Sequence, residues 1–597
     1  MRMARRRLLL AAGAAVAGCA VPTPPKREDA AAALRRLMGE TDEAFLDRHP
    51  IFGLYRGDLR RAAGHGDFIS AAYVDNERRV SEAALAELAR IPRDVLDTND
   101  RISYDTFRWT VEEWRDRHSP PASQFWPLLK LDQQNGWHLF FPELSSGDGI
   151  APYRTVADYD AGLSRIDGFV GWLDRAVARM REGMATGVVQ PRFVVERLLV
   201  QFERFATQPR DESPYWRPIR TMPSEIPAAQ AERLRAAYAR ALEDTLRPAF
   251  RRTLSFLRDE YLGRTRSSAG LSALPGGAAY YRFLIRSNTT LPLEATQIHQ
   301  LGVAEVERIQ RGIASVMSEV GFRGTRGEFF QMLRSDKRFE PASAEALTEA
   351  YAAIGRRVGA TLGRLFDTRP ATPLAMRPTP AESAPNDAAA RYMPGAVELG
   401  KPGVFYFNTF DLRRRPTWGM ETLYLHEAVP GHHFETMLAR ENAALPPLQR
   451  FAGNTAFSEG WALYAESLGF ELGLFTDPYQ RAGHYNDELL RAMRLVVDTG
   501  LHDQAWTREQ AIGYMLANSA MSEGDVVAEV ERYIVNPGQA LAYKVGALTI
   551  RRLRERAERA LGSRFDVRAF HRQVLGTGGI PMQVLEAKIE AWVAAGG

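Results

Sequence analysis

Three histidines and a glutamate lie close together in the chain, at His426, Glu427, His432 and His433. The whole sequence of 597 residues has only 11 histidines, so this short run holds more than a quarter of them. Neutral imidazoles are good zinc ligands, and a carboxylate beside one of them can take a proton from a water molecule that the metal activates. The residue types therefore predict a zinc site with hydrolytic chemistry. The alternative is a set of buried core histidines.

The spacing of this run departs from the familiar zinc motif His-Glu-x-x-His, in which two histidines sit four residues apart on one helical face. The fourth residue after His426 is Pro430. On an unbroken helix His432 would face away from His426, while His433 would face the same way about 10.5 Å along the axis. Pro430 and Gly431 favour a bend, because proline removes a helical donor and glycine permits unusual dihedral angles. We expect the bend to make His432 the second ligand, with His433 as the alternative.

A third zinc ligand is predicted at Glu459, in a segment whose apolar pattern is helical. The helix would begin at Asn454 or Ser458, which are good N-cap residues, and Glu459 would lie in its first turn. The alternative is that the helix dipole alone favours an acidic residue there. Two histidines and a glutamate leave a fourth position open for water, as in catalytic zinc sites. The prediction is one Zn²⁺ per chain, held by His426, His432 and Glu459.

Several runs of the sequence resemble those of the bacterial domain-of-unknown-function 885 family. The strongest lie at 405–409, 425–434, 458–461, 498–502 and 537–544, and weaker ones lie at 135–138 and 273–277. The similarity extends over roughly residues 45–592. This family in turn resembles the mostly helical zinc peptidases of the angiotensin-converting-enzyme, thimet-oligopeptidase and Taq-carboxypeptidase type. Those peptidases carry His-Glu-x-x-His and a downstream glutamate.

The resemblance implies a mainly α, large zincin-like peptidase fold with a deep cleft and a small β element next to the zinc helix. Glu427 is the candidate general base, because it follows the first ligand as the base does in the shorter motif. Tyr543 lies in a segment that resembles the place where the related peptidases put a transition-state tyrosine, although such tyrosines are usually core residues. His502 is a second candidate donor or simply the end of a helix. Lys544 is a candidate for holding a substrate carboxylate.

Most of the chain has the apolar periodicity of helices, at 31–38, 83–89, 159–182, 228–261, 293–320 and 344–366, the last with Ser343 as a plausible N-cap. A loop rich in glycine, serine and proline lies between 263 and 277, so we predict an N-terminal helical subdomain at 31–265 and a zinc-site catalytic subdomain at 266–597. Seven prolines between 370 and 402 argue against regular structure over most of that stretch. A short strand is predicted at 404–409. In the related peptidases a strand there pairs with an extended substrate, whereas a strand with no free edge would be structural.

The N-terminus has the layout of a secretory signal. Three arginines at 5–7 precede an apolar run at 8–15 and small residues directly before Cys19, the only cysteine of the chain. We predict a signal peptide at 1–18, a lipidated Cys19 and a tether at 19–30. The protein would then be a lipoprotein on the periplasmic side of a bacterial membrane, and the arginines also fit the twin-arginine export route. The alternative is an ordinary buried cysteine; with a single cysteine no intrachain disulfide is possible.

The positive net charge of the chain comes from this N-terminal segment. The sequence has 77 basic and 73 acidic residues, and residues 1–18 contain four arginines and no acidic residue. Removing those four leaves 73 basic against 73 acidic residues, so the mature chain is formally neutral. The charge therefore gives no support for binding to nucleic acid.

Together these features predict a zinc metallopeptidase that cleaves short peptides or amides with metal-activated water. One alternative is a zinc hydrolase of non-peptide amides or esters, which the same site could support. Another is an inactive binding lipoprotein of the same fold, and the retention of both Glu427 and Glu459 argues against it. The restriction to short peptides rests on the family resemblance alone.

Overall fold

The computed structural model describes residues 26–380, 384, 388–397, 400–451 and 453–597. The signal peptide predicted at 1–18 and Cys19 lie outside these residues, as does most of the tether predicted at 19–30. The end of that tether is helical, because α1 begins at Arg27. None of the helices in the described ranges combines the length and the hydrophobicity that a bilayer span needs.

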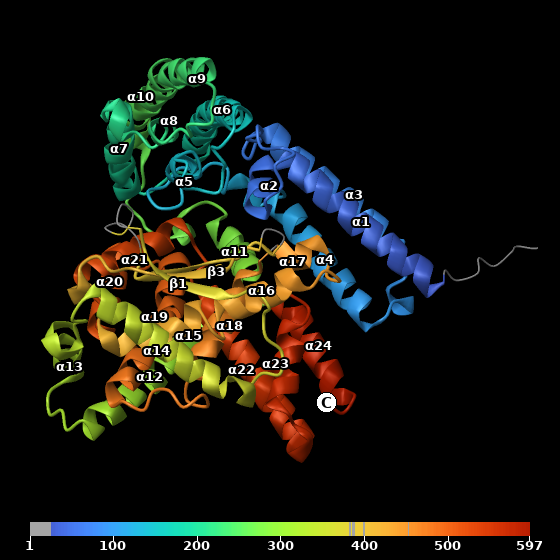
Figure 1. Cartoon of the computed structure of the whole chain (residues 1–597), viewed down its shortest axis with the longest axis vertical. Helices are drawn as coiled ribbons and strands as arrows, with labels where there is room; N and C mark the ends of the chain where they lie inside the picture. Colours follow the sequence, from blue (N-terminus) through green and yellow to red (C-terminus); the bar gives the residue numbers. More distant parts are fainter. Residues whose placement is uncertain (1–25, 381–383, 385–387, 398–399, 452) are drawn as a thin grey trace, which may run out of the picture.

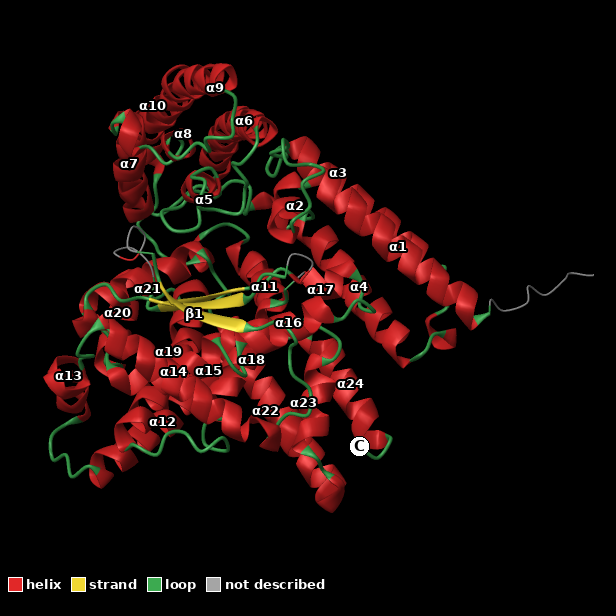
Figure 2. Ribbon diagram, in the orientation of Figure 1, coloured by secondary structure: helices red, strands yellow, loops and turns green. Residues whose placement is uncertain are grey.

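Helices dominate the structure, and one small sheet accompanies them in the described residues, which confirms the mainly α class (Figure 2). Figure 1 shows three groups of helices: α1–α4 along one side, α5–α10 at the top, and α11–α24 with the sheet below. The first group consists of α1 (Arg27–Arg48), α2 (Pro50–Arg56), α3 (Ala71–Leu88) and α4 (Thr98–Arg117). The second consists of α5 (Trp137–Leu144), α6 (Val156–Thr186), α7 (Arg192–Thr207), α8 (Arg217–Arg220), α9 (Ala228–Arg240) and α10 (Arg247–Ser255).

The helices before residue 265 form two hydrophobic cores rather than one. The α5–α10 group has its own core, around buried side chains such as Phe169 and Phe250. The core of α1, α3 and α4 also includes Leu448, which belongs to the second half of the chain, whereas Ile51 and Leu54 of α2 join the core of the α5–α10 group. Phe125 likewise joins the large core of the α11–α24 group. The first group thus shares core residues with the second half of the chain, whereas the second group has a core of its own. The predicted boundary between two subdomains at residue 265 stays a prediction.

The third group begins with four helices: α11 (Gly277–Thr289), α12 (Ala295–Glu319), α13 (Arg326–Ser335) and α14 (Ala344–Thr361). Ser343 caps α14, as the sequence predicts, because its hydroxyl accepts a hydrogen bond from the backbone N–H of Ala346 at 3.1 Å. After the sheet come α15 (Met420–Glu427), α16 (His432–Glu441), α17 (Pro447–Phe451), α18 (Thr455–Ser467), α19 (Pro478–His502), α20 (Arg508–Asn518), α21 (Glu523–Val535), α22 (Leu541–Leu561), α23 (Val567–Leu575) and α24 (Met582–Ala594).

The sheet has three strands, β1 (Leu374–Pro378), β2 (Ala390–Met393) and β3 (Gly403–Phe407), in the order β1-β3-β2. The predicted strand is present as β3, but it is the central strand, parallel to β1 and antiparallel to β2. Because both edges of β3 are paired, this strand cannot pair with a substrate as the related peptidases suggest. The prolines were predicted to exclude regular structure over most of this stretch, and two short strands, β1 and β2, nevertheless lie within it. β1 ends at a proline, a position that strands tolerate.

The sheet is packed against the helices that lead to the histidine run. Phe405 and Phe407 of β3 are fully buried, and both rings lie 5.0 Å from the ring of Tyr351 on α14. Tyr424 on α15 packs edge-on against Phe405. These aromatic contacts fix α15, which carries His426, against the sheet.

Helices α18 and α22 approach each other at two glycines. A Cβ atom at Gly460 would lie 2.6 Å from the Cα of Gly546, and one at Gly546 would lie 2.0 Å from the carbonyl oxygen of Ala456. No larger residue fits at either position without moving a backbone. The contact therefore holds α22 directly against the helix that carries Glu459.

Candidate metal centre

A sharp turn separates the first two histidines. Helix α15 ends at Glu427, and α16 begins at His432, so Pro430 and Gly431 interrupt the helix as the sequence predicts. A Cβ atom at Gly431 would lie only 1.9 Å from the carbonyl oxygen of His426, so only glycine fits there. The indole N–H of Trp461 on α18 donates to the carbonyl of Pro430 at 2.8 Å and ties the turn to the next helix.

The turn brings His432 beside His426, opposite Glu459 of α18. Each of the three residues offers one ligand atom, and these atoms all lie within 4.8 Å of one another. Glu459 Oε2 is 3.6 Å from His426 Nε2 and 3.5 Å from His432 Nε2. The set combines three short stretches of chain that meet only in the folded protein.

His433 lies in a different environment. Its side chain is 3% exposed, and its Nδ1 forms a hydrogen bond of 3.0 Å with the hydroxyl of Tyr392 on β2. Burial lowers the pKa of His433 to about 4. The structure thus places His432, and not His433, next to His426 and Glu459.

Neighbouring side chains orient both imidazoles. His426 Nδ1 donates to Glu466 Oε1 at 2.8 Å, which leaves the lone pair on Nε2 directed toward Glu459. His432 Nδ1 lies 3.4 Å from the hydroxyl of Ser458 and 3.7 Å from Glu435. A carboxylate behind a histidine is the usual second partner of a metal-ligating imidazole.

The donor atoms fit a small divalent cation. Glu459 Oε2 is buried and accepts no hydrogen bond from the described residues, although the two Nε2 atoms face it at 3.5 and 3.6 Å. Three atoms of acceptor character would repel one another unless a proton or a cation lay between them. Zinc bonds of about 2.0–2.2 Å at tetrahedral angles place neighbouring ligand atoms about 3.4 Å apart. Two of the three donor separations are therefore close to those around a zinc ion, and the residue types suit this metal.

Without a cation, the same charges shift the ionisation of the donors. Burial lowers the pKa of His432, but the neighbouring Glu435 and Glu459 outweigh it and hold that pKa well above its ordinary value. Burial raises the pKa of Glu459, but His426 and His432 outweigh it and hold that pKa well below its ordinary value. The arrangement of charges thus favours positive charge at this site.

Glu427 is the last residue of α15 and follows His426 directly. Its side chain is half-buried and makes no hydrogen bond or ion pair within the described ranges. Its charge nevertheless helps to raise the pKa of His432, so the carboxylate lies within electrostatic reach of the donors. Glu427 is therefore an unpaired carboxylate at the site and not one of the three converging donors.

Tyr543 lies in the first turn of α22, three residues before the close contact of Gly546 with α18. Its ring is half-buried beneath the guanidinium of Arg494, 4.5 Å from the ring centre. Its hydroxyl makes no hydrogen bond to any residue that the structure describes. Tyr543 therefore retains a free donor on a helix that packs against the Glu459 helix.

His502 and Lys544 have partners within the protein. His502 ends α19 and is fully buried; its Nδ1 accepts from the N–H of Leu271 and its Nε2 donates to the carbonyl of Tyr533. No N–H of that ring remains for a substrate, so we leave His502 out of the proposed mechanism. Lys544 is equally buried and lies 2.8 Å from Glu305 and 2.7 Å from Glu488. It is not available to a substrate carboxylate.

Glu459 lies one turn deeper in its helix than predicted. Asn454 caps α18 by accepting from the N–H of Phe457 at 3.1 Å, so Glu459 falls in the second turn. The attraction of helix termini for acidic residues fades after the first turn. The helix dipole therefore explains a glutamate at this position less well than the sequence alone suggested.

Several neighbours of the site were not predicted from the sequence. Glu435 lies three residues after His432 on one helical face, a spacing that could have suggested it. Asp487 and Arg491 of α19 lie beside Glu466, and Arg491 Nη2 is 3.8 Å from its Oε1. Burial raises the pKa of Asp487 to about 6. No local signal marks these two, because only the tertiary fold brings α19 to the site.

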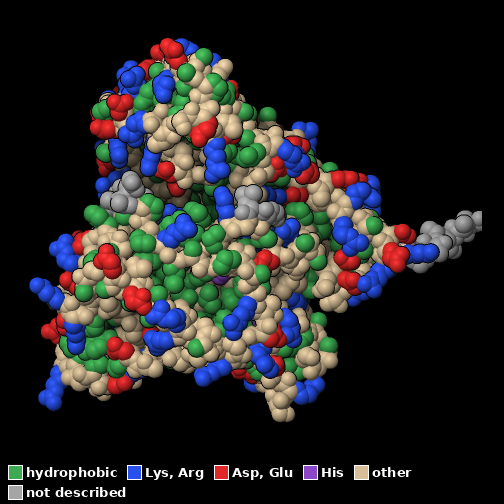
Figure 3. Space-filling view, viewed as in Figure 1, with side chains coloured by type: hydrophobic (Ala, Val, Ile, Leu, Met, Phe, Trp, Pro, Cys, Tyr) green, Lys and Arg blue, Asp and Glu red, His purple; other side chains and the backbone are tan. Residues whose placement is uncertain are grey.

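Figure 3 shows hydrophobic side chains gathered on the face below the α5–α10 group, with a histidine visible among them. An apolar surrounding with a few polar groups is typical of small-molecule sites.

Two solved structures are similar to this chain over nearly its whole length. One is described as the "putative lipoprotein from Colwellia psychrerythraea"; it is 28% identical, with a TM-score of 0.85, and the match covers 95% of this chain and 99% of that one. The other is described as a "putative lipoprotein of unknown function from Shewanella oneidensis". It is 17% identical, with a TM-score of 0.72 and coverage of 93% and 99%, and shows the fold alone. Neither description names an activity or a ligand.

A match to a family model supports the family resemblance that the sequence runs indicated. No curated protein matches the chain. The family model described as "Bacterial protein of unknown function (DUF885)" matches residues 50–589, which include α15, α16 and α18. Since this match spans most of the sequence, the chain belongs to the DUF885 family of bacterial proteins.

Proposed function

We propose that this protein is a zinc-dependent hydrolase that cleaves the peptide bonds of short peptides. The observation that carries the proposal is the convergence of His426, His432 and Glu459, with the buried Glu459 Oε2 facing two imidazole nitrogens at 3.5 and 3.6 Å. Two histidines and one glutamate form a donor set of catalytic zinc sites, which leave a position for water. The unpaired carboxylate of Glu427 beside them supplies the base that hydrolysis needs.

Each residue of the site has a distinct role in the proposed reaction. Zinc held by the three donors would act as a Lewis acid and lower the pKa of a water molecule. Glu427 takes a proton from that water and later passes it to the leaving amine. Glu466 accepts the Nδ1 proton of His426 and so keeps its ring turned with Nε2 toward Glu459.

Tyr543 is the proposed donor to the oxyanion of the transition state. Tyr543→Phe removes the hydroxyl and keeps the ring beneath Arg494, so folding and zinc content should persist. Loss of one oxyanion donor typically lowers turnover by about 10²–10³-fold. Steady-state kinetics and metal analysis of the purified variant test this expectation. A variant with unchanged turnover would show that another group stabilises the oxyanion.

The proposed function predicts that the purified full-length chain binds about one zinc per molecule and hydrolyses members of a peptide library. Chelation should abolish the hydrolysis, and added zinc should restore it. Metal analysis by mass spectrometry and detection of cleaved peptides are the measurements. Hydrolysis that survives complete chelation would contradict the metal mechanism.

The same experiment separates the alternatives. Cleavage of a panel of amides and esters, without cleavage of any peptide, would identify a hydrolase of non-peptide substrates. Zinc binding with no turnover on either panel would instead support an inactive binding protein. The free carboxylate of Glu427 favours a hydrolase over an inactive binding protein, since a binding site has no need of a base.

The proposed location is the cell envelope, by lipidation of Cys19 after export. The similar structures are described as lipoproteins, and the sequence of residues 1–19 has the layout of a lipoprotein signal. Cys19→Ser removes the thiol that would carry the lipid, so the protein should leave the membrane fraction or remain unprocessed. Fractionation of cells and the mass of the mature chain test this. Normal processing and membrane partition of the variant would remove the lipoprotein assignment.

A further inference from the structure

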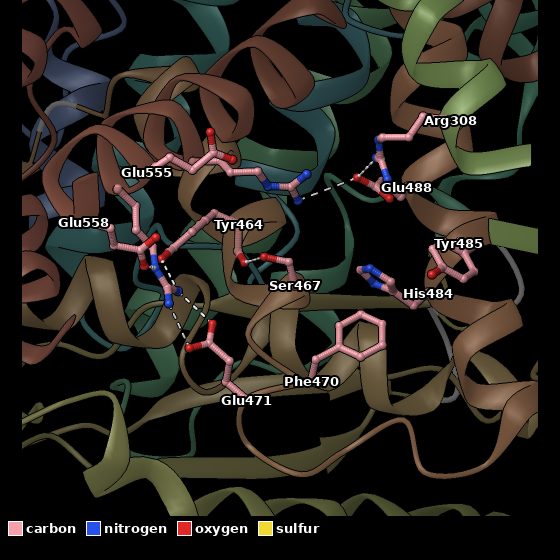
Figure 4. A pocket seen from close by; sticks show the side chains of 12 residues that line it. Arg308, Tyr464, Ser467, Phe470, Glu471, His484, Tyr485, Glu488, Glu555 and Glu558 are labelled. Atoms are coloured by element: carbon pink, nitrogen blue, oxygen red, sulfur yellow. Dashed lines mark hydrogen bonds and ion pairs between the residues drawn. The ribbon is translucent and has the colours of Figure 1, made fainter. Parts of the chain in front are cut away.

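A cavity of about 330 Å³ lies beside α18, on a different face of this helix from the candidate metal centre. It is lined by residues of α12, α18, α19 and α22 and of the segment between α18 and α19 (Figure 4). Tyr464 and Ser467 of α18 line it, whereas Glu459 and Glu466 of the same helix face the metal donors. The successive angle of 100° per residue places these two pairs on different sides of the helix. The cavity is therefore distinct from the candidate metal centre.

Most charges near this cavity neutralise one another. Arg308 and Lys544 each contact Glu305 and Glu488 at distances between 2.6 and 2.9 Å, so two bases meet two acids. Arg554 is likewise bound by Glu471 and Glu558. Of these groups Arg308, Glu471, Glu488, Arg554 and Glu558 line the cavity, and each is already engaged in a close ion pair.

Arg551 and Glu555 are the exceptions. Arg551 makes no hydrogen bond among the described residues, and its nearest acid is Glu488 at 3.8 Å, which Arg308 and Lys544 already satisfy. Glu555 lies one turn later on α22, and its one recorded partner is Arg559 at 3.9 Å. Arg551 and Glu555 form no ion pair with each other, although their spacing would permit one. The cavity thus offers one weakly paired cation and one weakly paired anion on the same helical face.

A buried imidazole also lacks a partner. His484 is 4% exposed, and neither of its ring nitrogens forms a hydrogen bond in the part of the chain that the structure describes; Nδ1 is fully enclosed. Its ring stacks on Phe475 and meets the edge of Phe470, whose own side chain is 45% exposed. Figure 4 shows His484 between Phe470 and Glu488. A buried polar group without a partner costs free energy, so a ligand that hydrogen-bonds to His484 would recover it.

We propose that this cavity binds a small zwitterion, namely a free amino acid or dipeptide with an apolar side chain. Its carboxylate pairs with Arg551 and accepts a hydrogen bond from Nε2–H of His484, its ammonium group pairs with Glu555, and its side chain packs against Phe470. The volume is at the lower end for small-molecule sites and suits a ligand of this size. The inference is independent of the proposed hydrolase activity, since none of these residues belongs to the metal site.

The test is a calorimetric titration of the full-length chain in detergent with the free amino acids, including L-leucine and L-phenylalanine. At least one apolar amino acid should bind, and Arg551→Gln should weaken its binding by about 10–100-fold. Glu555→Gln should weaken the binding too, and so should N-acetylation of the ligand, which removes the ammonium charge. His484→Phe keeps the stacked ring, removes both nitrogens and should also lower the affinity.

The matched control is Arg552→Gln, because Arg552 is the next residue on α22 but pairs with Glu586 outside the cavity. This variant should bind the amino acid as the unmodified chain does, and thermal unfolding should show that all variants are folded. Binding that disappears on chelation of metal would place the ligand at the metal centre and overturn the proposal. Equal binding of acetate or phosphate would reveal an anion site instead. Absence of binding by every amino acid would refute the proposal outright.

Discussion

Replacing Glu427 by glutamine is expected to lower turnover by about 10²–10⁴-fold without loss of zinc, because general base assistance typically contributes that much. The amide has the shape of the carboxylate but cannot take a proton. Glu427 makes no hydrogen bond or ion pair within the described residues, so folding should not depend on its charge. Steady-state kinetics, metal analysis and thermal unfolding of the same preparation provide the three measurements.

Glu441→Gln is the matched control for this change. Glu441 lies on α16 near the site but accepts hydrogen bonds from the backbone of Ala371 and Thr372 rather than facing the donors. Its glutamine variant should retain full turnover. Loss of zinc in Glu427→Gln would show that Glu427 is a ligand, and full activity with zinc retained would show that it is not the base.

The alanine variants of His426, His432 and Glu459 are each expected to lose stoichiometric zinc, and activity with it. A mononuclear site with three protein donors loses a large part of its binding free energy when one is removed. His433→Ala should retain more metal than His432→Ala, because the ring of His433 is bonded to Tyr392 instead. Metal content after dialysis, compared with circular dichroism, separates loss of metal from loss of fold.

The two histidine variants control each other, since they are adjacent and chemically identical changes. His433 is more buried than His432, so a general structural effect should harm His433→Ala more. If His433→Ala remained folded by circular dichroism but lost more zinc than His432→Ala, His433 would be the ligand and the donor set would have to be redrawn. If all four variants kept zinc, the metal would lie elsewhere.

Local sequence signals were sufficient where the chain itself determines the geometry. Pro430 and Gly431 predicted the turn because their effect on the backbone does not depend on distant residues. Ser343 and the periodic apolar stretches predicted α14 and the long helices for the same reason. The histidine run upstream favoured Glu459 as a ligand more strongly than its place near a helix start could.

Predictions failed where a distant partner decides the outcome. The sequence places His502 at the end of a helix. Only the fold shows that both nitrogens of its ring are hydrogen-bonded, to the backbone of Leu271 and of Tyr533. Lys544 is bound by two glutamates from α12 and α19. For the strand at 403–407 the sequence left open whether an edge is free, and only the fold shows that segments among the prolines pair with both of its sides. Neither composition nor spacing records such long-range contacts.

The glycine contact between α18 and α22 limits how far the spacing between Glu459 and Tyr543 can vary with time. Because backbone meets backbone at Gly460 and Gly546, no rotatable side chain lies between the two helices there. A slide of α22 by one residue would press the side chain of Val545 or Ala547 into α18. The axial distance between Glu459 and Tyr543 is therefore set by contact between main chains. Side-chain rotamer changes, which alter the spacing at other helix contacts, leave this distance unchanged.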